Sequence, residues 1–504
     1  MMRTWMKRVA LWMVVCLPVL AVAQQGTVRG FLYEQETGEP AIFTPVTLKG
    51  ANDLRLGAET DVNGYFSISK VPPGHYTLQV ISLGFDTLSK QMDVKKDQLI
   101  TEKIFLKKSS ILMRDLEVTA EKREAQNTVR LGVTKLSPKQ IERIPAIGGQ
   151  ADRAQYMQVI PGVVFTGDQG GQLYIRGGSP IMNKVMMDGM VLYNPFHSIG
   201  LFSVFDNDIL RNADVYTGGF NAEYGGRISS VMDITTRDGN KQRLSGKVSL
   251  NGANGSKASF FGFHFTDSVT YQGVSDLGWR NWGAGTNFVL VPTGSAVLID
   301  GVFALSNYKI QLKEGDLDPR LSEIAGFNGG LNFKYFIGED EAKYGIEILG
   351  FRTNYQFFNS IGLSSQQQQN TSELAGYFNY KKKLKDWVLD PGIRMHYYAS
   401  LSTLSIEPRF GMKWNISDNF RFKASAGRYS QNLVAANSDR DVVNLFYGFP
   451  SAPDDLPSTM TMQDGTVKDV KDPLQRADHF LAGFEVDLSK TTSVNIEGYY
   501  KNFR

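Results

Sequence analysis

The segment Gln172–Gly239 decides the fold of the chain and reads QLYIRGGSPIMNKVMMDGMVLYNPFHSIGLFSVFDNDILRNADVYTGGFNAEYGGRISSVMDITTRDG. Short runs of alternating apolar and polar residues in it are separated by turn residues, namely Gly177-Gly178, Asp188-Gly189, Gly218-Gly219 and Gly225-Gly226. The last stretch, from Ile228 to Thr236, has the pattern of a β-strand. The segment therefore predicts a small, compact, mixed α/β unit with sharp turns, not a long sheet.

Four motifs follow one another in this segment: IRGG (Ile175–Gly178), MDG (Met187–Gly189), YNPFH (Tyr193–His197) and GGFNAEYGGRISSVMDI (Gly218–Ile234). In this order they resemble the plug domain of TonB-dependent outer-membrane receptors. A Gly-rich soluble α/β domain could carry one of them, but the last motif is long and specific, and all four occur in the right order. The resemblance implies a plug that sits inside a β-barrel and blocks it. Its plug-motif residues are Arg176, Gly177, Gly178, Asp188, Gly189, Gly225, Gly226 and Arg227.

Residues 1–23 have the pattern of a secretory signal peptide. Basic residues precede the apolar run Val9–Val22, and Ala21-Val22-Ala23 supplies small residues for cleavage. A membrane-anchoring helix is the alternative, but the run is short, since a spanning helix needs about 20 apolar residues. The chain has one cysteine, Cys16, inside this segment, so we expect no disulfide and no Cys-ligated metal in the processed protein.

Residues 24–108 predict a separate β-sandwich with regularly spaced short strands and Gly/Pro turns. The expected strands are 27–33, 42–49, 65–68, 75–81 and 99–106. TDVNGYFSI from Thr60 and VPPGHYTLQVISLGF from Val71 resemble the carboxypeptidase-regulatory-like domain found ahead of the plug in many such receptors of the Bacteroidetes. None of the five histidines has Glu three residues later, so the zinc ligands of a carboxypeptidase are absent and we predict no metal, no cofactor and no enzyme activity.

Residues 109–127 predict a linker with charged flanks around RDLEVTAEKRE. Leu116 and Val118 alternate there with Glu117 and Thr119, so the piece can pair as a strand. The resemblance implies a TonB box, which adds a strand to the periplasmic protein TonB, and its candidate residues are Asp115, Leu116, Glu117, Val118, Thr119 and Ala120. A last sandwich strand or a plain linker is the alternative. In the plug, residues 128–239, we expect a short helix at Ala151–Val159.

Residues 240–504 predict amphipathic antiparallel strands of an outer-membrane barrel. Ile406, Phe410 and Trp414 fall on one face, while Glu407 and Lys413 fall on the other. A soluble sandwich also alternates, but short turns such as Gly338–Ala342 alternate with long polar loops, which we expect at Ser360–Glu373 and Asn432–Asp478, as barrels require. A plugged transporter has about 22 strands and these residues suffice for about 12, so we expect an incomplete barrel from a truncated receptor. A smaller closed barrel could not hold the plug.

The overall expectation is a mainly β chain: an N-terminal β-sandwich, a small α/β plug domain and a partial antiparallel transmembrane β-barrel in the Gram-negative outer membrane. A net charge of +3 gives no reason to expect nucleic acid. The resemblance implies active uptake energised by TonB with ExbB and ExbD, contact with outer-membrane lipid, and an undetermined ligand that is a ferric chelate, cobalamin, a glycan or a peptide. A surface lipoprotein partner stays open. The alternatives are a soluble or surface β-structural adhesin and a signalling receptor without transport.

Two further groups of residues are candidates for specific contacts. Plug residues Tyr193, Asn194, Phe196 and His197 form an aromatic and polar cluster that could touch the ligand. Arg176, Arg227 and Arg237 could pair with wall carboxylates such as Glu347, Glu407 and Glu497. Such pairs are individually weak when water reaches them, which would let the plug seal and still yield. Stabilisation of the plug from within is the alternative role of these arginines.

Overall fold

The structure is a computed structural model. It describes residues 25–51, 54–82, 84–109, 129, 131–136, 160–166, 172–195, 210–238, 247–251, 255–260, 263–266, 269–271, 275–314, 318–358, 364–434, 450–451, 459–461, 465–469, 474–489 and 492–504. The expected leader, the candidate TonB box Asp115–Ala120 and the helix expected at Ala151–Val159 lie outside these residues.

The N-terminal region is a β-sandwich, as the sequence predicted. Its strands are β1 (Gly26–Glu34), β2 (Pro45–Lys49), β3 (Arg55–Glu59), β4 (Tyr65–Val71), β5 (Gly74–Val80), β6 (Leu88–Val94) and β7 (Leu99–Leu106). They form two sheets, β4-β1-β7 and β3-β2-β5-β6, around a core that includes Val28, Leu32 and Leu78. Strands β3 and β6 escaped prediction because they are edge strands with almost no buried residues and little apolar alternation.

The middle unit, which we call the plug (described residues 129–238), is built on one small sheet. Its strands are β8 (Val133–Leu136), β9 (Val163–Thr166), β10 (Gln172–Ile175), β11 (Asn183–Met187), β12 (Met190–Leu192), β13 (Leu210–Tyr216) and β14 (Ser230–Thr236), with a 3-10 helix, η4 (Pro180–Met182). The five-stranded sheet has the order β12-β11-β14-β13-β8, and β9 pairs with β10. Leu210, Val215 and Ile234 lie fully buried in its core.

A second, much larger sheet, which we call the wall, follows the plug in sequence. Its strands are β15 (Lys247–Asn251), β16 (Gly255–Phe260), β17 (Phe263–Thr266), β18 (Val269–Tyr271), β19 (Ser275–Leu290), β20 (Val297–Glu314), β21 (Arg320–Ile337), β22 (Asp340–Phe358), β23 (Ser364–Leu384), β24 (Trp387–Tyr398), β25 (Thr403–Ser417), β26 (Phe420–Gln431), β29 (Gln475–Asp487) and β30 (Ser493–Phe503). A 3-10 helix, η6 (Ala399–Leu401), joins β24 to β25, and β27 (Thr459–Thr461) pairs with β28 (Val467–Asp469) outside the wall.

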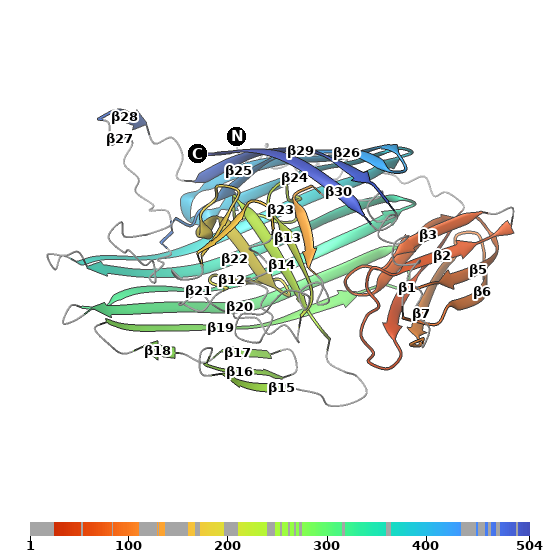
Figure 1. Cartoon of the computed structure of the whole chain (residues 1–504), viewed down its shortest axis with the longest axis horizontal. Helices are drawn as coiled ribbons and strands as arrows, with labels where there is room; N and C mark the ends of the chain where they lie inside the picture. The colour runs from red at the N-terminus through yellow and green to blue at the C-terminus, as the bar shows by residue number, and fades with distance from the viewer. Residues whose placement is uncertain are drawn as a thin grey trace, which may run out of the picture.

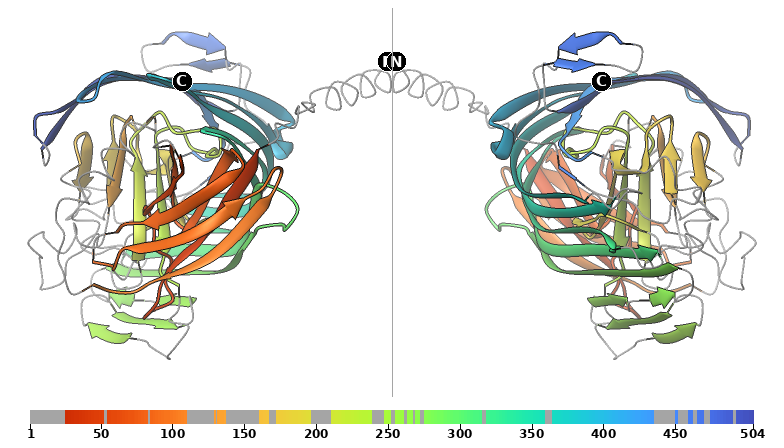
Figure 2. Two further views of the ribbon diagram at one scale, coloured as in Figure 1. Left: turned by 90° about the vertical axis from the view of Figure 1, so that its right-hand side faces the viewer. Right: turned by 90° about the vertical axis from the view of Figure 1, so that its left-hand side faces the viewer.

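The wall curls around the plug (Figures 1 and 2). Its strands are antiparallel neighbours in sequence order, and among the described strands β15 and β30 are the two ends of the sheet, which do not pair with each other. The expected partial barrel is therefore an open, curved sheet with the plug in its concave side. Within the described residues, no helix is long and apolar enough to cross a bilayer.

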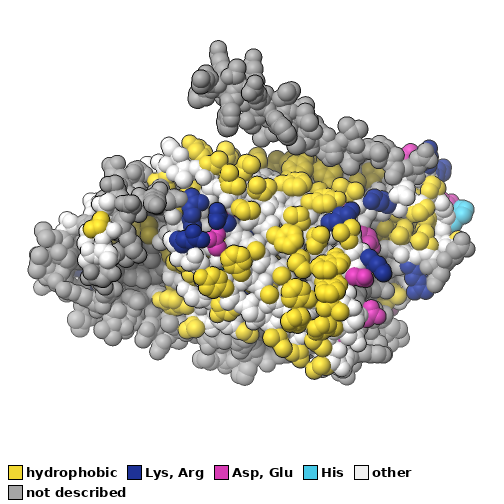
Figure 3. Space-filling view, turned by 90° about the horizontal axis from the view of Figure 1, so that it is seen from above, with side chains coloured by type: hydrophobic (Ala, Val, Ile, Leu, Met, Phe, Trp, Pro, Cys, Tyr) yellow, Lys and Arg dark blue, Asp and Glu magenta, His cyan; other side chains and the backbone are white. Residues whose placement is uncertain are grey.

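The two faces of the wall have opposite chemistry. Along β25, Glu407 and Lys413 are fully buried on the concave face, whereas Ile406 is 50% exposed on the convex face, next to other exposed apolar residues such as Phe410. Figure 3 shows apolar side chains spread over this outer surface. A protein in water buries apolar and exposes charged residues; this inversion fits an outer face solvated by lipid.

The turns of the wall differ at its two ends. Short turns lie at the end nearest the sandwich, as at Gly338-Glu339, where Gly338 N donates to Ser69 Oγ at 2.7 Å. Stacked aromatic pairs mark this end of the wall, including Trp387 with Trp414 at a centroid distance of 5.0 Å. The long loop expected at Ser360–Glu373 was wrong: β23 already begins at Ser364, because its run of Ser and Gln, 364–369, pairs with residues 353–358 at the end of β22.

Candidate functional site at the interface of plug and wall

The loop between β13 and β14, which contains the GGFNAEYGGR motif, is the part of the plug that the wall holds most closely. The guanidinium of Arg409, from β25, donates to the carbonyl oxygens of Asn221 and Tyr224 and packs 4.3 Å from the ring centroid of Tyr429. On the same loop, Ala222 N donates to Asn379 Oδ1 at 3.2 Å. In these contacts the wall side chains therefore bind the backbone of this loop and not its side chains.

A second point of attachment lies on the following residues of the plug. His479, from β29, is fully buried, and its Nε2 lies 2.8 Å from Ile228 O. Ile228 N donates to Gln431 Oε1 at 3.2 Å, and Lys501 Nζ donates to Ser229 O at 2.9 Å. Both polar groups of the Ile228 backbone thus bond to the wall, as a buried peptide group requires.

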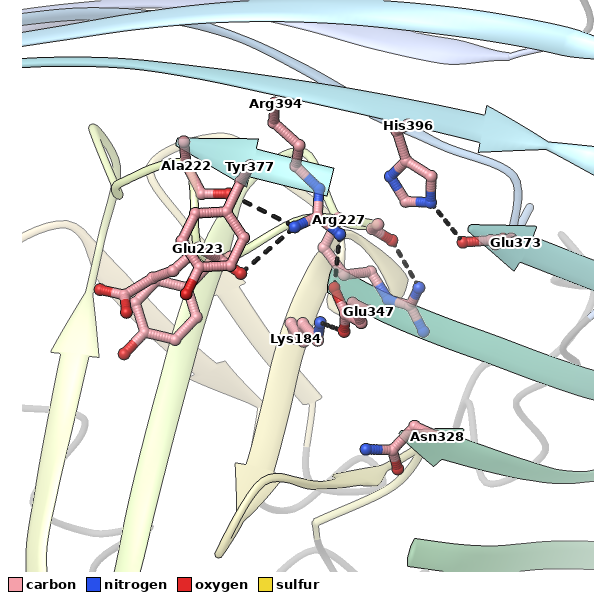
Figure 4. Close-up of polar contacts among 12 residues, drawn as sticks. Lys184, Ala222, Glu223, Arg227, Asn328, Glu347, Glu373, Tyr377, Arg394 and His396 are labelled. Carbon is pink, nitrogen blue, oxygen red and sulfur yellow. Dashed lines mark hydrogen bonds and ion pairs between the residues drawn. The ribbon is translucent and has the colours of Figure 1, made fainter. Parts of the chain in front are cut away.

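Glu347 stands at the centre of the interface (Figure 4). It projects from β22, and Lys184 Nζ, from plug strand β11, donates to it at 2.8 Å. Arg394, from β24, bonds to its other carboxylate oxygen and also donates to Ala222 O and Glu223 O at 3.3 Å. The Lys184 and Arg394 side chains are 6% and 1% exposed. One wall carboxylate therefore neutralises a plug cation and a wall cation whose side chains are almost completely buried.

A junction at Gly132 links three parts of the structure. Gly132 N donates to the Glu497 carboxylate of β30 at 3.0 Å, and Gly132 O accepts from Thr217 N at 2.7 Å. Arg176 Nη2 lies 3.2 Å from the same carboxylate. Gly132 is the first glycine of the described plug and has φ +67°. This junction fixes the entry of the chain into the plug sheet.

The IRGG and MDG motifs each form a tight turn. Arg176 and Gly177 have φ values of +47° and +84°, and Asp188 and Gly189 have +50° and +80°, which is the pattern of type I′ hairpin turns. Asp188 stabilises its own turn because its carboxylate accepts from Thr236 N at 2.8 Å. These residues shape the plug, and they bring the Arg176 side chain to the wall.

Two further motif glycines stand against wall or plug side chains. A Cβ built on Gly178 would lie 2.1 Å from Ser229 Oγ, and one built on Gly225 would lie 2.1 Å from Arg394 Nε. Gly226 differs because its φ of +74° needs glycine while its nearest neighbours lie 3.7 Å away. For Arg227, the hydrogen bond from Nη1 goes to the adjacent Gly226 O at 2.6 Å.

Of the three arginines expected to reach wall carboxylates, Arg227 donates to Gly226 O within the plug, and the other two differ from each other. Arg176 pairs with Glu497. Arg237 instead has its nearest carboxylate in the sandwich, with Nε 4.0 Å from Glu39, because it follows the end of β14 that points to the sandwich. Glu407 is engaged within the wall by Arg409 at 2.7 Å. Sequence reasoning missed Lys184, Arg394, Arg409 and His479. The last three belong to the wall and occupy inward positions of alternating strands, and this pattern could have identified them as residues that face the plug.

The candidate ligand cluster is only partly described. Asn194 Nδ2 donates to Tyr308 Oη at 3.0 Å, and Asn194 O accepts from Asn281 Nδ2 at 2.9 Å. Tyr193 packs against an apolar cluster with Trp279, and burial raises the pKa of its hydroxyl. Phe196 and His197 lie outside the described residues. The described members of the cluster thus face the wall.

The plug carries a group of acids near the wall. Asp233 lies opposite Asp214 in the pairing of β14 with β13, and Tyr224 Oη donates to Asp233 at 2.8 Å. Burial, with the nearby charges of Asp214 and Glu223, raises the pKa of Asp233 to about 6, against the Tyr224 hydrogen bond that lowers it. Asp233 therefore titrates near neutral pH.

This shift predicts that the plug becomes more stable as the pH falls. The folded-state pKa lies above the ordinary value of 3.8, so the stabilising contribution is full below pH 4 and is lost as the pH rises through 6. We expect a change of about 1–2 kcal/mol between these limits, since the carboxyl is only partly buried. Hydrogen exchange of the plug amides from pH 4 to 8 measures it. Asp233→Asn should remove the difference, and an unchanged profile in that variant would contradict the assignment.

A cavity of about 860 Å³ separates the plug sheet from wall strands β19 to β22. Its lining includes plug acids such as Asp188, wall glycines such as Gly329, and the sandwich residues Asp61–Asn63. A second cavity, of about 430 Å³, lies between the sandwich, strand β8 and wall strands from β21 onward. Among the described residues no group of three or more His, Cys, Asp or Glu could hold a metal ion.

Comparison with known proteins gives two matching family models. The CarboxypepD_reg-like domain matches residues 28–118, and the TonB-dependent Receptor Plug Domain matches residues 125–231. The first match extends past the last sandwich strand, β7, into the segment that contains the candidate TonB box.

Two individual proteins are similar to parts of the chain. The TonB-dependent transporter Oar of Myxococcus xanthus is 25% identical over 243 residues, which are 46% of this chain and 22% of that protein. The chain thus spans about a fifth of the length of this curated relative. The outer membrane transporter YddB of Escherichia coli has a similar fold, with a TM-score of 0.52 and 13% identity over 73% of this chain and 69% of that chain.

A plug held in the concave, polar side of an antiparallel wall with an apolar outer face defines an outer-membrane receptor. The chain carries a TonB-dependent Receptor Plug Domain and, ahead of it, a CarboxypepD_reg-like domain. Of the two similar proteins, Oar is a TonB-dependent transporter and YddB is an outer membrane transporter.

Proposed function

We propose that this receptor takes up a ligand too large or too scarce for porins, by active transport energised through TonB. The observation that carries the proposal is the character of the interface of plug and wall. It combines apolar contacts, such as that of Phe220 with Tyr429, with many ion pairs and hydrogen bonds, such as those of Glu347 and Arg409, and a large cavity lies beside them. An interface of this kind seals the wall yet can be taken apart bond by bond and re-formed.

The path of the force supports the same proposal. In our assignment TonB adds a strand to Asp115–Ala120, with ExbB and ExbD supplying energy from the inner membrane. The Gly132 junction follows this segment closely in sequence, and it ties β8 to Glu497 of the wall and to Thr217 of the plug. Strand β8 is the edge strand of the plug sheet and has four residues. A pull on the linker would reach this short edge strand before the centre of the plug.

The TonB assignment is tested by binding of the purified receptor to the purified periplasmic domain of TonB. Proline has no amide hydrogen, so Val118→Pro should weaken binding at least about tenfold if affinity comes from an added strand. Val118→Ala is the matched control and should bind nearly as the parent does. Equal affinity of all three proteins would reject Asp115–Ala120 as the TonB box.

A further inference from the structure

The N-terminal sandwich is seated on the short-turn end of the wall by specific contacts. Arg29 is fully buried, and its guanidinium donates to the carbonyl oxygens of Pro292 and Ser295 in the turn between β19 and β20. Its Nε donates to Thr101 Oγ1 at 3.1 Å, which holds the side chain in place. A buried arginine aimed at the carbonyls of another unit marks a built interface, since a buried cation needs such partners.

The next turn of the wall meets the sandwich as well. Gly338 N donates to Ser69 Oγ at 2.7 Å. The ring of Tyr65, which is 1% exposed, packs at a centroid distance of 5.8 Å from Phe336. Two neighbouring turns of the wall are thus held at once, which fixes the orientation of the sandwich.

The sandwich also contacts the plug. Arg211 Nη1, from β13, donates to Val62 O at 2.8 Å, and Lys135 Nζ, from β8, lies 3.7 Å from the ring centroid of Phe43. Phe43 and the Asp61–Asn63 turn line the 860 Å³ cavity between plug and wall. Figure 2 shows the sandwich lying across this end of the plug and wall.

We propose that the N-terminal sandwich is a cap that closes the plug cavity on the periplasmic side and must undock before a solute can leave it. The inference rests on the proposed transport function, because short turns face the periplasm in outer-membrane barrels. The cap holds plug and wall together, so it opposes movement of the plug while docked. The cavity lining contains charged residues of both signs, such as Lys184 and Asp214, among apolar ones such as Met186 and Phe288, so it offers both polar and apolar contacts to a solute.

Access to the cavity tests the cap without TonB and without the ligand. Thr235 lines the cavity on the plug side, and Cys16 is the one cysteine of the chain, so Thr235→Cys in a Cys16→Ser background places a single thiol there. Its modification rate with a bulky polyethylene-glycol maleimide is measured in the purified full-length receptor. Lys96→Cys, on the exposed surface of the sandwich, gives the reference rate for a free thiol.

We expect the Thr235→Cys thiol to react far more slowly than the reference. Adding Arg29→Ala should speed its modification about tenfold or more, since a hydrogen-bonded buried charge is lost from the interface. Ser69→Ala should give a smaller increase and cannot unfold the sandwich, because Ser69 lies partly exposed at its surface. His75→Ala is the matched control: it removes an exposed pair with Asp93, within the sandwich and among residues that line neither cavity, and should leave the rate unchanged.

A rate for Thr235→Cys equal to the reference would overturn the cap, as would a rate that neither Arg29→Ala nor Ser69→Ala changes. Hydrogen exchange of the β5 amides confirms in each variant that the sandwich itself stays folded. The labelling experiment contains neither TonB nor a ligand. A labelling result that contradicts the cap therefore does not contradict the transport proposal, and a negative TonB-binding result does not affect the interpretation of the labelling rates.

Discussion

Glu347→Ala is expected to destabilise the attachment of the plug by about 3–5 kcal/mol, which is the usual cost of removing one partner of a buried ion pair. The substitution leaves Lys184 and Arg394 facing each other in a site where they are 6% and 1% exposed. The two buried like charges lose the carboxylate that they share and repel each other, and neither can regain full hydration.

Hydrogen exchange of the β11 amides measures this effect. Each 1.4 kcal/mol accelerates exchange about tenfold where opening is local, so an increase of about a hundredfold or more is expected. Glu339→Ala is the matched control: it removes a wall carboxylate that pairs with Lys383 at 3.0 Å but is 71% exposed, so it should cost less than about 1 kcal/mol. If the two variants exchange alike, Glu347 does not hold the plug.

Gly225→Ala is expected to have the next largest effect, about 3 kcal/mol, because it adds a methyl group to a filled site. The new Cβ would stand 2.1 Å from Arg394 Nε and 2.5 Å from its Cζ. Arg394 is 1% exposed and bonds to Glu347, Ala222 and Glu223, so moving it disrupts several contacts together.

The neighbouring glycine supplies the comparison. Gly226→Ala has room for its Cβ and suffers only from the positive φ of that residue, which costs about 1 kcal/mol. Urea unfolding, followed by tryptophan fluorescence and by exchange of the plug amides, should therefore rank the variants parent, Gly226→Ala, Gly225→Ala. A reversed order would show that backbone conformation, not contact with Arg394, explains why this motif needs glycine.

The sequence predicted the units of the fold well, and for a physical reason. Wall strands such as β25 alternate because one face meets lipid and the other meets polar groups, so Ile406 and Glu407 could be assigned to opposite faces from their positions alone. The sharp turns of the plug could be placed because Gly177 and Gly189 adopt positive φ values. The prediction of a long loop at Ser360–Glu373 was wrong because Gln and Ser occur both in loops and in strands that extend beyond the membrane.

The contacts within the site were much harder to predict. The pair of Arg176 and Glu497 joins residues far apart in the chain, and nothing in a single sequence fixes which strand of a curved wall lies beside which turn of the plug. Lys184 looked like one polar residue in an apolar run, and its partner Glu347 could only be named as one of several carboxylates. The contact between Arg29 of the sandwich and the wall could not be predicted from the sequence, because a strand with one buried arginine has the same pattern as any half-exposed strand.

The aromatic pairs at the short-turn end of the wall determine how deeply the receptor is inserted in the bilayer. Trp387 stacks on Trp414, and Phe420 stacks on Phe484 at a centroid distance of 5.5 Å, beside turns that carry Lys385 and Asp418. Rings of this kind rest at the level of the lipid headgroups. A bilayer thinner than the apolar band would have to deform locally to avoid exposing these rings, at a cost of fractions of a kcal/mol per ångström of mismatch. A change in membrane thickness would therefore act on the same turns that hold the N-terminal sandwich.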